Sequence, residues 1–434
     1  MPKNKKHSLV FAWFICGLGA LYYAYEYLLR ILPSVMEDPL RDHFHLTATG
    51  FGLLASMYYY AYVPMQLPVG IMMDRFGPRR LLTFACSACV IGSYLFANTT
   101  LFSVAASGRF IVGFGSAFAY VGVLKLATIW LPENKLAVAT GSAASLGAVG
   151  AMVGDNYLGK LVHSQSWTSA IELSIWFGVI LTITLWLFLR DHKNDNKVGG
   201  SIPSIRKNFQ DLAIILRSKQ IWINGMYGSL VYLPTTVFAE LWGIPYLRHA
   251  HGLSHTAADF CNSLVFLGFT IGAPIMGYVS DKLKKRKPPM LIGALGAAFF
   301  MALVIYIPGL SKYTIGILLF LTGLFYSAQA IVFAVGRELS PKEAAGTAIA
   351  TTNMFVMIGA MFLQPLIGRL LDTSHRWYYS GTEGIINATS DTLNTVLYSP
   401  QDYQFALSII PVGIALAALL VLFLKETHAR QLHN

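Results

Sequence analysis

The chain has 434 residues, of which 55% are hydrophobic and 12% are charged, and its mean hydropathy is +0.54. A soluble domain carries about 25% charged residues, so the composition excludes a soluble globular protein and indicates an all-α polytopic membrane protein. The formal net charge of +11 is a feature shared with nucleic-acid-binding proteins. The distribution of the basic residues shows whether the charge indicates a nucleic-acid partner or the topology of the chain in the membrane.

Apolar stretches recur along the whole chain, each long enough to cross a bilayer core of about 30 Å as a helix. Twelve membrane-spanning helices are predicted, at 9–32, 49–72, 80–98, 101–129, 137–161, 168–189, 221–245, 255–279, 290–307, 313–336, 344–371 and 404–424. The basic start "MPKNKKHSLVFAWF" resembles a signal peptide, but its apolar run exceeds the usual length of about 7–15 residues. No small-residue cleavage site follows, so residues 9–32 are expected to be a retained first span.

The basic residues are distributed unequally between the two sides of the membrane. With the N-terminus inside, the predicted inner segments carry 23 Lys and Arg residues, whereas the outer segments carry four: Arg41, Arg248, Lys312 and Arg376. Lys and Arg accumulate in cytoplasmic loops, so both termini are predicted to be cytoplasmic. The basic charge therefore reports topology, and no nucleic-acid partner is expected.

The longest charged segment, residues 190–220, divides the chain into two predicted six-helix bundles, 1–189 and 221–434. Within this linker, apolar residues recur at helical spacing between Ile205 and Leu216, which is typical of an amphipathic helix on the inner membrane surface. The two bundles also resemble each other, since "GAMVGDNYLGKL" (150–161) is repeated as "GAMFLQPLIGRL" (359–370). A duplicated unit of this kind predicts a binding site between the halves, near the middle of the membrane.

The four cysteines do not form a metal or redox motif. Cys16, Cys86, Cys89 and Cys261 all lie inside or at the edge of apolar spans. Cys86 and Cys89 form a CxxC pair with no histidine or second CxxC nearby, so packing is the better explanation. No disulfide, metal site or cofactor is expected, and the loops contain no nucleophile–base pattern typical of an enzyme.

The loop after the second span carries a spaced set of glycines and charges. It reads "GIMMDRFGPRR" (70–80), and "GYVSDKLKKRK" (277–287) follows the eighth span with Asp281 in the position of Asp74. The first copy resembles the loop 2–3 signature of the major facilitator superfamily at Gly70, Asp74, Arg75, Gly77, Arg79 and Arg80. The second copy lacks the equivalent of Gly77. The resemblance implies a secondary active transporter in which this network latches the outward-open state, with Gly70 allowing close helix approach.

Other stretches narrow the resemblance to a branch of that family. Arg109, Gly113 and Gly115 match the family's signature in span four, whereas span five lacks the Gly-Pro pair of the drug–proton antiporters. Residues 241–258 and 352–372 are similar to bacterial solute-uptake members, including organic anion symporters. Residues 25–36 are similar to amino-acid importers of intracellular bacteria and, more distantly, to lysosomal dipeptide carriers.

Ionisable residues inside the predicted spans are the first candidates for function. The resemblance implies that spans one, four, seven and ten line the cavity, and helix position places Glu26, Arg30, Asp155 and Glu240 around one outer vestibule. We expect proton coupling at Glu26, Asp155 and Glu240. We expect substrate contacts at Arg30, Arg109, Tyr27, Tyr59, Gln364 and Asn353.

The leading hypothesis is that Glu26 or Asp155 binds the driving proton while Arg30 or Arg109 holds a substrate carboxylate. The alternative for Glu26 and Arg30 is an i, i+4 ion pair that neutralises itself. Arg109 has the alternative of reaching to the outer surface, and Lys125 that of reaching to the inner one.

The sequence predicts a proton-coupled importer of a small zwitterionic or anionic nutrient, such as an amino acid, short peptide or carboxylate. The expected setting is a monomer surrounded by lipid in a bacterial inner membrane. Two alternatives remain open: a proton-driven efflux antiporter, and a transport-inactive scaffold or sensor with the same fold.

Overall fold

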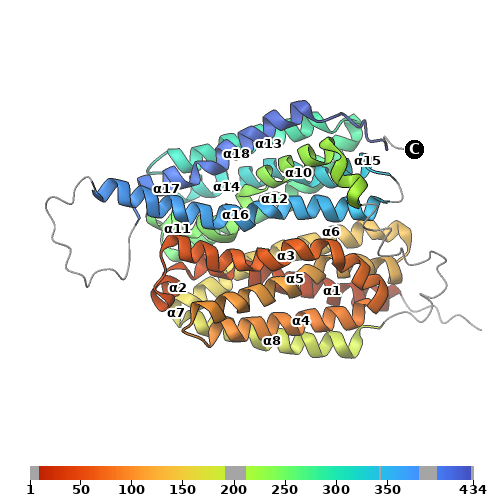
Figure 1. Ribbon diagram of the computed structural model, residues 1–434, viewed down its shortest axis with the longest axis horizontal. Coiled ribbons are helices and arrows are strands. Elements are labelled where there is room, and N and C mark those ends of the chain that lie inside the picture. Colours follow the sequence, from red (N-terminus) through yellow and green to blue (C-terminus); the bar gives the residue numbers. More distant parts are fainter. Residues whose placement is uncertain (1–8, 191–211, 342–343, 381–397, 432–434) are drawn as a thin grey trace, which may run out of the picture.

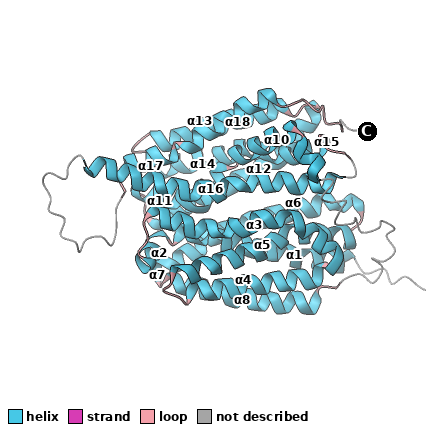
Figure 2. Cartoon of the chain, viewed as in Figure 1, coloured by secondary structure: helices cyan, strands magenta, loops and turns pink. Residues whose placement is uncertain are grey.

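The computed structural model describes residues 9–190, 212–341, 344–380 and 398–431. Every regular element in these ranges is a helix (Figure 2). Most of the amphipathic helix expected between Ile205 and Leu216 lies outside the described residues, as does the middle of the expected outer loop 372–403.

The N-terminal half, residues 9–190, is a series of long helices joined by short connections. These are α1 (Leu9–Val35), α2 (Glu37–Phe44), α3 (Ala48–Phe76), α4 (Pro78–Ala97), α5 (Phe102–Trp130), α6 (Glu133–Val153), the π-helical segment η1 (Gly154–Leu158), α7 (Gly159–Ser164) and α8 (Trp167–Phe188).

The C-terminal half, described from residue 212 on, repeats this organisation. Its elements are α10 (Lys219–Val231), the π-helical segment η3 (Pro234–Trp242), α11 (Gly243–His249), α12 (His255–Leu283), α13 (Lys287–Tyr306), α14 (Lys312–Tyr326), the 3₁₀ turn η4 (Ser327–Ala330), α15 (Ile331–Glu338), α16 (Ala345–Ser380), α17 (Pro400–Leu407) and α18 (Ile409–Phe423).

Nine helical stretches in the described residues are long and apolar enough to cross a membrane. They coincide with nine of the expected spans, so the chain is an integral multi-pass membrane protein. The other three expected spans coincide with α3, with α6 to α7 and with α10 to α11, and for these the crossing stays a prediction.

The signature loop between α3 and α4 is a tight reversal built by two residues. Gly77 has a φ of 79°, a conformation that favours glycine, and its N–H closes the end of α3 on the carbonyl of Met73. Pro78 then occupies the first turn of α4, where a missing N–H costs nothing. Gly77 therefore supplies the backbone conformation of the turn, and Pro78 starts the helix that follows it.

The two halves lie side by side with their helices nearly parallel to the long axis (Figure 1). α3 of the N-terminal half lies against α16 of the C-terminal half, and the two helices run in opposite directions. The left end in Figure 1, which holds α2, α7, α11 and α17, is the one predicted to face outward. We call it the outer end, and the opposite end the inner end.

Glycines show that the halves touch at the outer end. A Cβ atom on Gly52 would come within 2.6 Å of the Gln364 carbonyl oxygen, and one on Gly368 within 2.2 Å of the Ala48 carbonyl oxygen. A carbon cannot approach a carbonyl oxygen so closely, so α3 and α16 pack there backbone to backbone.

Glycines near the inner ends of the same helices make no such contact. A Cβ atom on Gly70 or Gly346 would have no neighbour within 4 Å outside its own helix. Gly70 makes no close helix contact in this conformation, and its expected role in close helix approach stays a prediction. The halves therefore pack closely at the outer end, and Gly70 and Gly346 face open space near the inner ends of α3 and α16.

Candidate functional site

Three charged residues from both halves meet in the interior. Arg30 Nη2 donates to Glu26 Oε1 at 3.0 Å and to Oε2 at 3.2 Å, and both side chains project from one face of α1 because they are four residues apart. On the opposite side, Arg30 Nη1 lies 3.7 Å from Glu240 Oε1 of the C-terminal half. The three residues are at most 3% exposed, so one guanidinium joins two buried carboxylates.

Tyrosines from α3 complete the hydrogen bonding of this cluster. Tyr58 accepts a hydrogen bond from Arg30 Nε at 3.0 Å and donates to Glu26 Oε2 at 2.9 Å. Tyr59 donates to Glu240 Oε2. Two adjacent residues of α3 thus bond to the two carboxylates, Tyr58 to Glu26 and Tyr59 to Glu240.

Aromatic rings enclose the guanidinium of Arg30. Its Cζ atom lies 4.5 Å from the ring centre of Tyr27 and 4.9 Å from that of Tyr62. Tyr27 also reaches the other half, since its hydroxyl lies 3.2 Å from that of Tyr232. A guanidinium over ring faces is stabilised without a counter-ion, so Arg30 can exchange one carboxylate for another at moderate cost.

Glu240 is the less completely bonded of the two carboxylates. Within the described part of the chain, its Oε1 atom is buried and accepts no hydrogen bond. Glu240 lies in η3, a nine-residue π-helical segment in the middle of the helical stretch from α10 to α11. Segments of π-helix often mark functional sites because they displace side chains from the regular α-helical positions.

Arg109 lies beside the cluster but is engaged elsewhere. Its Nη1 and Nη2 groups donate to the backbone carbonyls of Leu29 and Arg30, at 2.9 and 3.3 Å. These contacts hold α5 to α1 at the turn that carries Arg30. The geometry gives Arg109 a bracing position, and Arg30 is the arginine that faces the other half.

Asp155 does not join the cluster that the sequence grouped it with. It lies in η1, and its Oδ2 atom accepts a hydrogen bond from Asn262 of α12 at 2.8 Å. Asn262 also donates to the Ala239 carbonyl oxygen, next to Glu240 in the chain. Asp155 therefore contacts the other half at a separate place, and Asn262, which sequence reasoning missed, links it to η3.

The two amides expected at the site lie along the contact between the halves. Gln364 donates to the Thr236 carbonyl oxygen at 2.7 Å, and Asn353 donates to Gln66 Oε1 at 2.7 Å. Gln66 is a residue that the sequence reasoning missed. The bond from Asn353 to Gln66 crosses from α16 to α3, nearer the inner end than Gly52.

The expected outer vestibule is not open in this conformation. Glu26, Arg30, Asp155 and Glu240 are all buried, because the contacts of α3 with α16 close the molecule on the outer side. A residue count along a single helix indicates depth in the membrane, and it contains no information on closure by the other half.

The gating motif lies at the inner end. Arg75 and Arg80 are exposed, and Arg79 donates to the Trp186 carbonyl oxygen of α8 at 2.8 Å. The side chain of Asp74 lies outside what the structure describes. In the second copy, Asp281 accepts from Arg286 at 2.6 Å, and Arg286 also pairs with Glu338 at 2.6 Å. The partners of Asp281 were not anticipated.

A second charged cluster crosses between the halves at the outer end. Arg248 donates to Asp38 Oδ2 at 2.7 Å, and His249 Nε2 lies 3.6 Å from Glu37 Oε2 and 3.7 Å from Asp38 Oδ1. The carboxylate of Asp38 and then that of Glu37 raise the pKa of His249 to about 9. Burial alone would raise the pKa of Asp38, but His249 and Arg248 hold it well below its usual range.

The outer cluster gathers two carboxylates around one imidazole. The ligand atoms of Glu37, Asp38 and His249 all lie within 4.8 Å of one another. Sequence reasoning missed this group, because Glu37 and His249 are more than 200 positions apart in the chain.

The sequence profile described as "Major Facilitator Superfamily" matches residues 14–363. Among curated proteins, the chain is similar to the "Uncharacterized transporter YybO" of Bacillus subtilis (strain 168), with 24% identity covering 83% of this chain and 88% of the relative. It is also similar to the "Probable galactarate/D-glucarate transporter GudP" of the same organism, with 26% identity covering 86% and 88%.

Two further similarities are informative. The "Membrane sensor protein UhpC" of Escherichia coli (strain K12) is 24% identical and covers 87% of this chain and 88% of its own length. Among solved structures, an inward-facing, occupied bacterial homologue of the human lysosomal transporter Spinster has a TM-score of 0.74 at 16% identity, covering 95% and 97%. The second similarity concerns the fold alone.

Proposed function

The chain belongs to the Major Facilitator Superfamily, and we propose that it imports a small anionic or zwitterionic nutrient by proton symport across a bacterial inner membrane. The family and the relatives YybO and GudP are membrane transporters, not enzymes. The finer statements, on substrate, coupling ion and direction, are our proposal.

The observation that carries the proposal is the sharing of Arg30 between Glu26 of one half and Glu240 of the other. Separating an ion pair in a buried site leaves an uncompensated charge, which costs several kcal/mol. The halves can therefore part at this cluster only if Glu240 is neutralised or if another anion replaces it on Arg30.

A coupled cycle follows from that constraint. A proton on Glu240 cancels its charge, and the Tyr59 hydroxyl turns to accept from the new carboxylic acid. The Nη1 group of Arg30 then becomes available to a substrate carboxylate, as a hydrogen bond between charged groups. Proton and substrate thus favour each other's binding, which is the requirement for symport.

The nature of the relatives supports an anionic substrate. One similar protein is named as a galactarate/D-glucarate transporter, and these compounds carry two carboxylates. Once Glu240 is neutralised, two guanidinium groups face one carboxylate, which suits such a ligand. Arg109 lies beside Arg30 and bonds only to backbone carbonyls in the described contacts.

The proposal is tested by uptake into proteoliposomes with labelled galactarate, glutamate and a dipeptide, with and without an inward proton gradient. At least one of these compounds should accumulate only with the gradient. Arg30→Lys, which removes the guanidinium fork, should raise KM at least tenfold, equivalent to about 1.4 kcal/mol of lost binding. Arg376→Lys, an exposed outer arginine, is the control and should behave as the wild type.

Uptake that ignores the proton gradient would refute coupling, and unchanged KM in Arg30→Lys would refute the role of Arg30. A proton-driven efflux antiporter would instead expel the labelled compound when the gradient is applied, and would bind hydrophobic cations without need of Arg30.

A second candidate function is that of a substrate sensor. The similarity to a membrane sensor protein favours it, because that relative is covered over nearly its whole length. A sensor would bind an anion with dependence on Arg30 and yet accumulate none in proteoliposomes, so the binding and uptake measurements together separate the two functions.

A further inference from the structure

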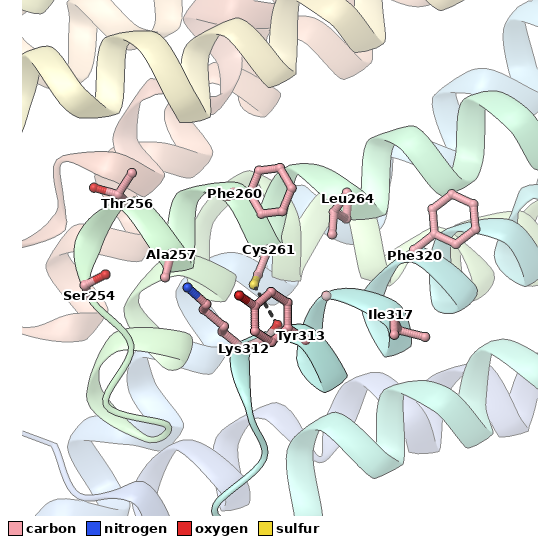
Figure 3. Close-up of a pocket in the computed structure, with 11 residues that line it drawn as sticks. Ser254, Thr256, Ala257, Phe260, Cys261, Leu264, Lys312, Tyr313, Ile317 and Phe320 are labelled. Atoms are coloured by element: carbon pink, nitrogen blue, oxygen red, sulfur yellow. Dashed lines mark hydrogen bonds between the residues drawn. The ribbon is translucent and has the colours of Figure 1, made fainter.

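A groove opens on the side of the C-terminal half, away from the charged cluster, between the first halves of α12 and α14 (Figure 3). Its volume is about 560 Å³, within the range of about 300–1,000 Å³ that small-molecule sites occupy. Because both helices are predicted spans with exposed apolar side chains here, the groove faces the lipid bilayer.

One end of the groove is polar and the rest is apolar. Ser254, Thr256 and Lys312 lie toward one end in Figure 3, whereas Ile317 and Phe320 lie toward the other. The polar end belongs to the first residues of both helices, which begin at the outer end of the molecule. The gradient from polar to apolar thus runs from the outer membrane surface toward the bilayer centre.

Lys312 is available to a ligand. Among the described residues no carboxylate lies within ion-pair distance of its ammonium group, which lies 5.0 Å from the ring centre of Tyr313. By contrast, the outer basic residues Arg41 and Arg248 are paired with Glu37 and Asp38. Lys and Arg are scarce on the outer side of membrane proteins. The ammonium of Lys312 is therefore a notable positive charge there, and it can bind an anion from outside the chain.

The start of α12 adds to this preference. Ser254 is the N-cap residue of α12, but its hydroxyl caps no backbone N–H of that helix. Unbonded N–H groups at a helix start and the helix dipole both favour a negative group nearby. The ammonium of Lys312 and the uncapped start of α12 therefore present positive potential at the mouth of an apolar groove, whereas the Ser311 hydroxyl caps the start of α14.

We propose that this groove binds one anionic phospholipid of the outer leaflet. The phosphate lies at Lys312 and the Ser254 hydroxyl, and an acyl chain lies along Phe260, Leu264 and Ile317. A zwitterionic lipid fits the apolar part equally well but brings its own positive charge to Lys312, so the site prefers an anionic headgroup. The proposal is independent of the transported substrate.

The position of the groove links the lipid to closure of the outer end. Its lining residues Thr256 and Phe260 alternate along α12 with His255 and Asp259, which face the N-terminal half. There Asp259 lies 3.3 Å from His163, and the rings of His163 and His255 are 4.0 Å apart. A bound lipid would thus support the helix that carries one side of this contact.

The test is native mass spectrometry of the purified full chain titrated with phosphatidylglycerol and with phosphatidylcholine of the same acyl chains. One phosphatidylglycerol should bind the wild type about fivefold more tightly than phosphatidylcholine, the factor expected for one lysine near an anionic surface. Lys312→Gln should remove this preference. Gly316→Leu should weaken both lipids, since a side chain at Gly316 points to Leu264 at 2.9 Å and fills the groove.

Lys282→Gln is the matched control, because Lys282 also lies over a tyrosine ring, that of Tyr278, at the other end of α12. It should leave the preference unchanged. Equal binding of the two lipids by the wild type, or equal losses in Lys282→Gln and Lys312→Gln, would identify non-specific annular lipid and overturn the proposal. A monodisperse elution profile for each variant establishes that the losses do not come from unfolding.

Discussion

At the scale of single residues, the two buried glutamates differ in how completely they are bonded. Glu26 accepts from Arg30 through both oxygens and from Tyr58. Glu240 accepts one hydrogen bond, from Tyr59, and its other oxygen lies 3.7 Å from Arg30. Since a carboxylate with fewer partners gains more from a proton in a buried site, Glu240 is the better candidate for the coupling residue. Glu26 orients Arg30.

Glu240→Gln should therefore uncouple transport without abolishing it. The amide keeps the shape of the side chain and stays neutral, so substrate exchange across the membrane should persist within about threefold of the wild type. Accumulation driven by a proton gradient should fall at least tenfold, because no proton is bound or released. Counterflow and gradient-driven uptake of labelled substrate measure the two activities separately.

Glu172→Gln provides the control for this substitution, since Glu172 is an exposed glutamate of α8. Normal accumulation by Glu240→Gln would exclude Glu240 as the coupling site. If Glu26→Gln alone lost accumulation, the assignment of the two glutamates would be reversed.

At the scale of elements, α16 caps α3 across the boundary between the halves. The carboxylate of Asp372 accepts from the backbone N–H groups of Ala48 and Thr49, at 3.2 and 3.0 Å, and from the hydroxyls of Thr49 and Tyr398. These N–H groups start α3 and have no partner within that helix. A carboxylate at a helix start also interacts favourably with the helix dipole.

Asp372→Asn should weaken closure of the outer end. The substitution removes the negative charge and one acceptor, which costs about 1 kcal/mol and shifts the ratio of closed to open outer ends about fivefold. The measurement is the distance distribution between spin labels on Gln165 and Pro308, exposed outer residues of the two halves. The four native cysteines are buried and stay unlabelled.

Asp402→Asn is the comparison for this variant. Asp402 bonds to Ser399 and Ser374 within the C-terminal half and does not cross to the N-terminal half in the described contacts. Its distance distribution should match that of the parent chain. If the two variants have the same distance distribution, the hydrogen bonds from Asp372 to α3 do not keep the outer end closed.

At the scale of the whole molecule, charges from both halves meet at the closed outer end. His249 of α11 faces Glu37 and Asp38 of α2, and its pKa is raised from 6.5 to about 9. A raised pKa means that the protonated imidazole is stabilised while the halves touch. That stabilisation is complete below pH 6.5 and is lost as the pH rises through about 9.

Raising the external pH from 6.5 to 9.5 should therefore open the outer end. The same pair of spin labels on Gln165 and Pro308 should report a larger fraction of long distances at the higher pH. In His249→Gln the side chain cannot be protonated, so the distance distribution should be already shifted at pH 6.5 and should respond less to pH. A His249→Gln variant with the full response of the parent would assign the pH dependence to another group.

The sequence predicted the spans with good accuracy because each is a local property of composition. The nine stretches recovered from the described residues need only about twenty apolar residues each, and Gly77 with Pro78 defines the turn after α3 without help from distant parts of the chain. The i, i+4 pairing of Glu26 with Arg30 is local in the same way. The family was predicted from motifs that are also short segments of the sequence.

Contacts between the halves could not be read from the chain. Helical periodicity places Glu240 in span seven, but the π-helical turns of η3 change the direction of its side chain, and only packing of η3 on α1 brings it to Arg30. Asp155 lies at a comparable depth by residue count and yet faces Asn262, because its neighbours belong to α12. The position of a residue along its helix predicts how deep the side chain lies, but it does not predict which side chain it contacts.

The sequence by itself determined a family, a set of membrane helices and the ionisable residues within them. The tertiary structure decided which of these residues share Arg30, which end of the molecule is closed, and where Gly70 faces open space. The physical reason is how far apart along the chain the interacting residues lie. Helix formation and membrane insertion depend on neighbours along the chain, whereas ion pairs between halves depend on how two rigid bundles meet, and that changes with each step of the transport cycle.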